Sequence, residues 1–206
     1  SEIVYKRQDL TGEFIKDKIN FEAKEGSKSL FVFEKREEGE EFLKILTGLK
    51  EPKEGEIFLM GQNLKEMTRD KIFEIKKRIA TVFKTGGLIN NLSVWENLVL
   101  PALYHKVSDE ESIKKRVLEL LNEFEYKKDF MSKVNELTSL ERRIIGIIRG
   151  LLMKPEIIIF EYPFDGISQN EKEWLAERIE KLSKNLTSIF ILGSESEIYL
   201  VDKKGA

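Results

Sequence analysis

The stretch Arg149-Gly-Leu-Leu-Met-Lys-Pro-Glu-Ile-Ile-Ile-Phe160 decides the fold class of this 206-residue chain. Its last residues, 156–160, form a short apolar run, which is typical of a strand that is buried on both faces of a sheet. The residues before it continue a helical pattern that opens at the capping box Thr138-Ser-Leu-Glu141. A helix followed at once by a fully buried strand predicts an α/β protein with a largely parallel sheet.

The rest of the chain repeats this alternation of short apolar runs and helical patterns. We predict further strands at residues 29–33, 56–60, 79–83, 188–192 and 197–201, and helices at 41–49 and 68–77.

Residues 88–150 differ from the rest because they carry helix signals and no strand signal. The capping boxes Ser93-Val-Trp-Glu96 and Ser108-Asp-Glu-Glu111 open two helices there, ahead of the one at Thr138, and Ser168-Gln-Asn-Glu171 opens a later helix. We therefore expect a helical subdomain at 88–150, inserted into an α/β core that is formed by residues 1–87 and 151–206.

Composition excludes several classes of function. The 35 Lys and Arg residues against 37 Asp and Glu residues give a net charge of −2, which argues against a nucleic-acid partner. With no Cys and one His, thiolate and His-rich metal sites are excluded, and no metal site is expected. No apolar run approaches the roughly 18 residues of a membrane span, and the first residues are unlike a signal peptide. A cytoplasmic location is therefore expected.

Landmarks in order along the chain resemble the ATP-binding subunit of ABC transporters. The stretch at 46–57, Leu-Thr-Gly-Leu-Lys-Glu-Pro-Lys-Glu-Gly-Glu-Ile, is similar to the family's run after the phosphate loop. Residues 92–97 are similar to its "LTVxEN" helix start, and 149–155 to its "RALxxxP" run before the Walker B strand. The resemblance covers nearly the whole chain. It implies a P-loop NTPase-like core with a mainly parallel sheet, antiparallel strands near the N-terminus and an inserted helical subdomain.

The phosphate loop of that family reads G-x-x-x-x-G-K-[ST], where backbone amides cradle phosphates and the Lys neutralises them. A gapless alignment places Phe33 at the first glycine, Gly39 at the Lys, and Glu40 and Glu41 at the hydroxyl positions. Residues 34–41 hold five Glu against Lys35 and Arg36, a local charge of −3, which would repel a phosphate. We expect Glu40 and Glu41 to lie at a helix N-terminus, where carboxylates suit the helix dipole.

The family's other nucleotide positions are altered as well. The adenine-stacking aromatic aligns best with Leu10, the Q-loop glutamine with Lys84 and the switch His with Ser194. We expect Lys84 to be a solvated loop lysine. Walker B ends in Glu161 and Tyr162, and Tyr162 stands where the family has its catalytic Glu. The signature LSGGQ aligns with residues 137–141, whose last four are Thr138, Ser139, Leu140 and Glu141.

Phosphoryl transfer depends on positioning and charge neutralisation, and those are the parts that have changed. The resulting hypothesis is a catalytically inactive ABC ATPase-like subunit with no catalytic residue and no cofactor. One alternative is a divergent ATPase that uses ATP and Mg, with Lys35 or Arg36 on the phosphates and Glu161 on the metal. The other is a homodimer that binds a new ligand in the old cleft, beside Phe33 and Tyr162.

The run from Phe83 to Pro101 is similar to one branch of the family, the ATPases of Mla-type lipid transporters. The resemblance implies an ABC permease as partner, an active ATPase subunit, or a second copy in a homodimer, within a lipid transport complex. It also implies contact with the membrane only through a permease, which allows a peripheral place on the inner face of the cytoplasmic membrane. The groove that would hold a permease is predicted from five apolar residues, Leu88, Ile89, Leu92, Trp95 and Leu98.

Overall fold

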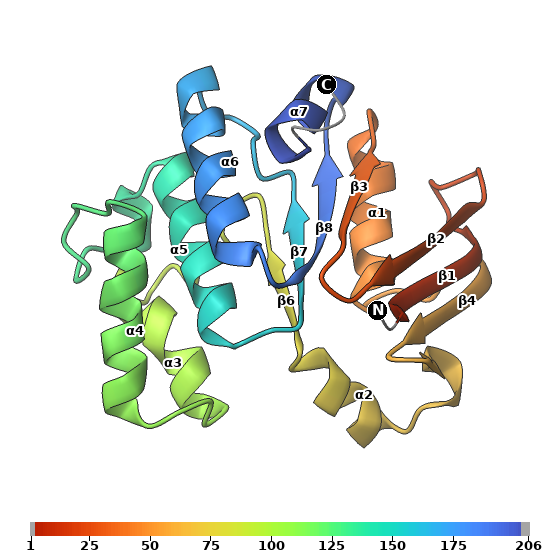
Figure 1. Cartoon of the computed structure of the whole chain (residues 1–206), viewed down its shortest axis with the longest axis horizontal. Helices are drawn as coiled ribbons and strands as arrows, with labels where there is room; N and C mark the ends of the chain where they lie inside the picture. Colours follow the sequence, from red (N-terminus) through yellow and green to blue (C-terminus); the bar gives the residue numbers. More distant parts are fainter. Residues whose placement is uncertain (1–2, 203–206) are drawn as a thin grey trace.

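The computed structural model describes residues 3–202, and their side chains from residue 9 onward. A first, antiparallel sheet is formed by strands from the N-terminal part of the chain and lies to the right in Figure 1. Its strands run in the order β2-β1-β4-β5, with bounds Ile19–Lys24, Ile3–Thr11, Glu54–Leu59 and Gln62–Asn63. The turn between β4 and β5 takes Met60 and Gly61 into positive φ, at 49° and 75°. The expected antiparallel strands near the N-terminus are therefore confirmed.

A second, parallel sheet forms the centre of the molecule, and it confirms the predicted α/β class. Its order is β3-β8-β7-β6, with bounds Lys28–Val32, Thr187–Leu192, Ile157–Glu161 and Ile79–Val82. All residues of β7 and β8 are buried. Side chains alternate across a strand, so Ile158 and Phe160 enter one apolar core, whereas Ile157 and Ile159 enter a second core on the opposite face. This two-sided burial explains why the strand reads as an unbroken apolar run.

Helices cover both faces of the parallel sheet (Figure 1). Helix α1 (Arg36–Leu46) packs between the two sheets through Phe42, Leu43, Ile45 and Leu46. The opposite face carries α5 (Ser139–Leu152) and α6 (Gln169–Ser183), with α3 (Val94–Tyr104) and α4 (Glu110–Glu123) packed on α5. Shorter elements are α2 (Arg69–Lys76), α7 (Ile198–Val201), and the 3-10 turns η1 (Leu64–Glu66), η2 (Val134–Glu136) and η3 (Glu195–Glu197).

Three of the four predicted capping boxes are confirmed. The side chains of Ser93, Thr138 and Ser168 accept from the backbone three residues on, and the Glu there reaches back to the cap. The box at Ser108 is wrong, because Asp109 caps α4 and accepts from the Ser112 backbone at 2.9 Å. An Asp side chain is as good a cap as Ser, so the pattern alone left the start uncertain by one residue.

One predicted strand and one predicted helix start are also wrong. The last apolar run is no strand: residues 198–201 form the short helix α7, which packs on α6 and buries Leu200 and Val201. Four residues are too few for periodicity to separate a strand from a helix turn. Helix α1 starts at Arg36 rather than at residue 41.

Between residues 3 and 202, no helix combines the length and the hydropathy needed to cross a bilayer.

The close approach of α5 to the loop after β6 leads to a stability prediction. A Cβ on Gly146 would lie 2.8 Å from the carbonyl oxygen of Gly86, whereas a Cβ on Gly150 would meet only side chains at 3.4 Å or more. Gly146→Ala should lower the free energy of unfolding by about 1–3 kcal/mol. Gly150→Ala should raise it by up to about 1 kcal/mol, the helix preference of Ala over Gly. Urea denaturation of both variants would contradict the packing if Gly146→Ala were as stable as Gly150→Ala.

Candidate functional site

The loop between β3 and α1 stands where the sequence placed a phosphate loop. Lys35 is the N-cap of α1, and its carbonyl accepts from the N–H groups of Glu38 and Gly39, at 3.2 and 3.4 Å. Backbone amides that would face a phosphate in an open loop are therefore used by the helix. The side chain of Lys35 is exposed and lies 3.5 Å from Glu38. Phe33 is buried in the core, 5.2 Å from the ring of Phe42.

Tyr162 fills the space between α1 and the end of β7. Its side chain is fully buried, and its backbone takes a positive φ of 44°. A Cβ at Gly39 would lie 1.8 Å from the tyrosine hydroxyl, so only glycine leaves room for the ring. The guanidinium of Arg36 lies 4.0 Å from the ring centroid. Burial raises the pKa of Tyr162 to about 12.

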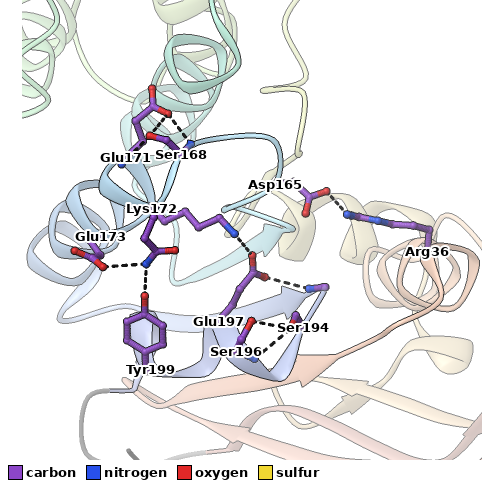
Figure 2. Close-up of polar contacts among 12 residues, drawn as sticks. Arg36, Asp165, Ser168, Glu171, Lys172, Glu173, Ser194, Ser196, Glu197 and Tyr199 are labelled. Carbon is purple, nitrogen blue, oxygen red and sulfur yellow. Dashed lines mark hydrogen bonds and ion pairs between the residues drawn. The ribbon is translucent and has the colours of Figure 1, made fainter.

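Arg36 is held by a carboxylate from the turn after β7. It forms an ion pair with Asp165, and the two side chains point toward one another in Figure 2. Gly193, at the end of β8, lies next to this pair: a Cβ there would be 3.7 Å from Arg36, Asp165 and Tyr162 alike. No feature of the sequence predicted the contact of Asp165 with Arg36.

Lys84, the second residue after β6, makes three contacts with three different elements. Its ammonium lies 2.8 Å from Glu40 on α1, and its N–H donates to Glu161 on β7 at 3.0 Å. Its carbonyl accepts from Arg143 on α5 at 2.8 Å. The hydrogen bond from Lys84 lowers the pKa of Glu40. The expectation of a solvated loop lysine is wrong, because the carboxylates that hold Lys84 come from distant parts of the chain.

Arg143 is a buried cation that sequence reasoning missed. Its side chain is 2% exposed, and its Nε and Nη1 atoms have no hydrogen-bond partner within the part of the chain that the structure describes. Burial lowers its pKa, while the charges of Asp165 and Glu197 oppose that shift. It follows the charged residues Glu141 and Arg142 in the first turns of α5, so the sequence did not distinguish it from an exposed Arg.

Glu41 faces away from this cluster. Its carboxylate accepts from the backbone N–H groups of Glu13, Phe14 and Ile15, at 2.8, 2.8 and 3.0 Å. It also pairs with Lys50 at 2.6 Å. The expectation that Glu40 and Glu41 lie at a helix N-terminus is wrong, since α1 begins four residues before Glu40. Glu41 instead fixes the loop between β1 and β2 to the helix.

The remaining predicted positions form separate local structures. Ser194 caps η3 and lies 2.8 Å from the hydroxyl of Ser196, while Glu197 pairs with Lys172 at 2.9 Å (Figure 2). At the signature position, Thr138 and Glu141 cap α5, and Lys128 lies 3.1 Å from Glu141. Ser139 and Leu140 are the first two residues of α5.

The five predicted groove residues differ in exposure. Leu98 is fully buried, and Leu88 and Trp95 pack partly buried against the core. Leu92 is half-buried, and Ile89 is 53% exposed. Phe130, whose ring centroid lies 5.5 Å from that of Trp95, is also partly exposed. Ile89, Leu92 and Trp95 thus keep some exposed apolar surface, but Leu98 has none.

Six residues make up the α1–β7 cluster, namely Arg36, Glu40, Lys84, Glu161, Tyr162 and Asp165. Each cation in it is paired with a carboxylate, and the ring of Tyr162 occupies the space at Gly39. A bound ATP with magnesium does not fit this arrangement. A phosphate would have to displace a buried ring and break two ion pairs, next to Glu161.

Comparisons with known proteins agree with the fold. A family model described as "ABC transporter" matches residues 41–165. A similar structure is the dimeric ABC transporter cassette MJ0796, with a TM-score of 0.80, 23% identity, and coverage of 95% of this chain and 90% of that one. At that identity the likeness speaks for the fold alone.

Several transporter ATP-binding proteins are similar in sequence. The intermembrane phospholipid transport ATP-binding protein MlaF of Haemophilus influenzae is 25% identical, over 95% of this chain and 74% of its own length. The probable sulfate/thiosulfate import ATP-binding protein CysA of Chlorella vulgaris is 30% identical, over 88% and 75%. The methionine import ATP-binding protein MetN of Francisella tularensis is 25% identical, over 90% and 53%. The chain thus spans about half the length of MetN.

The buried carboxylate of Glu41 leads to a prediction on acid stability. Burial raises its pKa, but the hydrogen bonds from Lys50 and from three backbone N–H groups outweigh burial and lower the pKa from 4.5 to about 2. Its stabilisation is therefore full above about pH 4.5 and is lost as the pH falls toward 2. Glu41→Gln should lower the free energy of unfolding by about 2 kcal/mol at pH 7.

Glu13→Gln is the matched control, because Glu13 also pairs with Lys50, at 3.2 Å, but from an exposed side chain. It should cost less than about 0.5 kcal/mol. Denaturation of both variants from pH 7 to pH 3 provides the test. A gap between wild type and Glu41→Gln that does not shrink in acid would refute the low pKa.

Proposed function

The chain belongs to the ABC transporter family, and from that premise we propose that it is a catalytically inactive ATPase-like subunit. Its role would be structural or regulatory within a transport complex, and it would work without ATP or magnesium. The observation that carries this proposal is the position of the Tyr162 hydroxyl, 1.8 Å from where a Cβ of Gly39 would lie. Tyr162 follows Glu161, the Walker B position, and its ring fills the space beside Gly39, which aligns with the Lys of the phosphate loop.

The chemistry of Tyr162 supports the same conclusion. Hydrolysis of ATP needs an oriented water, and a carboxylate is the usual side chain at this position in the family that the sequence resembles. A phenol with a pKa of about 12 is a poor proton acceptor near pH 7. The two cations beside it, Arg36 and Lys84, are already neutralised by Asp165 and Glu40. The divergent-ATPase alternative would require both pairs to break.

The burial of two residues argues against the other alternative, a homodimer that binds a new ligand in the old cleft. Phe33 and Tyr162, which were expected to line such a cleft, are both buried in the same core. Both rings pack against α1, and neither is exposed to a ligand.

The partner that fits best is an ABC permease, with an active ATPase subunit or a second copy of this chain as further members. The likeness to MlaF, which is named for intermembrane phospholipid transport, supports a lipid cargo. The dimeric cassette MJ0796 supports pairing between such subunits. In this proposal the protein lies in the cytoplasm and contacts the inner face of the membrane only through the permease.

The apolar surface around Ile89 is the proposed permease-binding groove. Ile89 is 53% exposed, and Phe130 and Met131 beside Trp95 are 40% and 60% exposed. Exposed apolar side chains gathered on one surface are typical of binding sites between proteins.

Calorimetric titration with ATP and magnesium tests the proposal directly. We expect no saturable heat at millimolar ATP, because binding would displace the Tyr162 ring and break two ion pairs. A relative with an intact phosphate loop is the positive control. One-site saturation by wild-type protein, together with ATP hydrolysis that Glu161→Ala abolishes, would replace this proposal by the divergent-ATPase alternative.

The proposed groove is tested by one exposed substitution and its matched control. Ile89→Asp should reduce co-purification of an ABC permease from native membranes at least about tenfold, since a charge would be buried in the interface. Leu118→Asp, on α4 at 52% exposure, should leave recovery unchanged. Mass spectrometry of the bound permease quantifies both. Equal recovery with the two variants would place the contact elsewhere.

A further inference from the structure

We propose that Lys84 is a fixed joint, which holds the helices α3–α5 in one orientation on the α/β core without any nucleotide. The proposed permease-binding groove, which begins four residues later, would then be presented permanently in its binding shape. This inference rests on the proposed function and adds a mechanism of regulation to it: the surface for a partner does not respond to ATP.

Lys84 sits where the chain passes from the core to the helices. It binds α1 through its ammonium and Glu40, and β7 through its N–H and Glu161. It binds α5 through its carbonyl and the buried guanidinium of Arg143. Lys84 therefore contacts three separate elements, through its N–H, its carbonyl and its charged side chain.

The segment after Lys84 is fastened to the helices and would move with them. Arg149 on α5 donates to the carbonyls of Gly86 and Gly87, at 3.0 and 2.8 Å. The buried side chain of Asn97 accepts from the N–H of Ile89 at 2.8 Å and donates to its carbonyl at 3.1 Å. A rotation of the helices against the core would therefore act on Lys84, as well as on the apolar packing of α5 against β6.

Other polar links between the helices and the core lie farther along the chain. Lys181 and Arg178 on α6 pair with Glu123 and Glu125, at the end of α4. In both of these pairs one side chain is more than 60% exposed, whereas Lys84 and Glu40 are 34% and 39% exposed. The pair at the joint is the better shielded from water, and shielding strengthens an ion pair.

The joint also explains the place of Glu40. A carboxylate in the second turn of α1 would face an incoming phosphate if the helix N-terminus were open. Here its charge is paired with Lys84, with smaller contributions from Lys44 and Arg36. The negative charge that would repel a nucleotide thus fixes the lysine of the joint.

The test measures the orientation of the helices directly. The chain has no Cys, so spin labels can be attached to Lys53→Cys in the core and Lys115→Cys on α4. We expect a single narrow distance distribution in the protein without nucleotide. Lys84→Met and Glu40→Gln should each broaden it at least about twofold, their double variant no further, and Lys84→Arg should keep it narrow.

Lys77→Met is the matched control, because Lys77 pairs with Glu74 at 2.7 Å and is 37% exposed, but both residues lie on α2 and its cap. It should leave the distribution unchanged. An unchanged distribution in Lys84→Met, or equal broadening in Lys77→Met, would overturn the joint. Two results together would separate the proposals. If the wild-type protein bound ATP in calorimetry and Lys84→Met still broadened the distance distribution, the inactive-subunit proposal would be overturned and the joint would stand.

Discussion

The packing of one tyrosine ring against one glycine determines how α1 sits on the parallel sheet. Because Gly39 has no Cβ, the helix comes close enough for the hydroxyl of Tyr162 to fill the space beside it. The ring is fully buried, and its backbone has a positive φ, a conformation that costs free energy in any residue but glycine. Such a conformation persists only where the surrounding packing holds it, and here α1, β7 and β8 all contribute.

The charges around that ring form a second layer of constraint. Arg36 covers the ring and is paired with Asp165, while Lys84 is paired with Glu40. These pairs connect α1 to the turn after β7 and to the loop after β6. A cation that is already paired gains little from a new anion, and an anion placed there would also meet Glu161. In our proposal the protein thus supplies from its own side chains the links that a bound nucleotide would otherwise make.

On the other side of α1, the carboxylate of Glu41 makes a similar link between the helix and a loop. Its carboxylate accepts from three successive backbone N–H groups of the loop between β1 and β2, much as a bound anion would. Gly12 in that loop is needed for the approach, since a Cβ there would lie 2.2 Å from the carboxylate. The sequence offered the five Glu of residues 34–41 as an acidic run, but it could not show that Glu40 and Glu41 have different partners, Lys84 and Lys50.

Local pattern determined much of this protein. Apolar runs and capping boxes identified the parallel strands and the helices α3, α5 and α6, because strand period, helix period and cap chemistry all act within a few residues. The family was expected only from the resemblance of ordered landmarks along the chain. Tertiary structure alone decided the roles of Lys84, Arg143 and Asp165, whose contacts lie 44 to 129 residues away along the chain. It also decided that residues 198–201 form a helix, since packing on α6 settles a run too short to specify itself. The partner of a charged residue cannot be read from the sequence, because only the fold brings the two residues together. The contacts of the site could therefore be identified only from the structure.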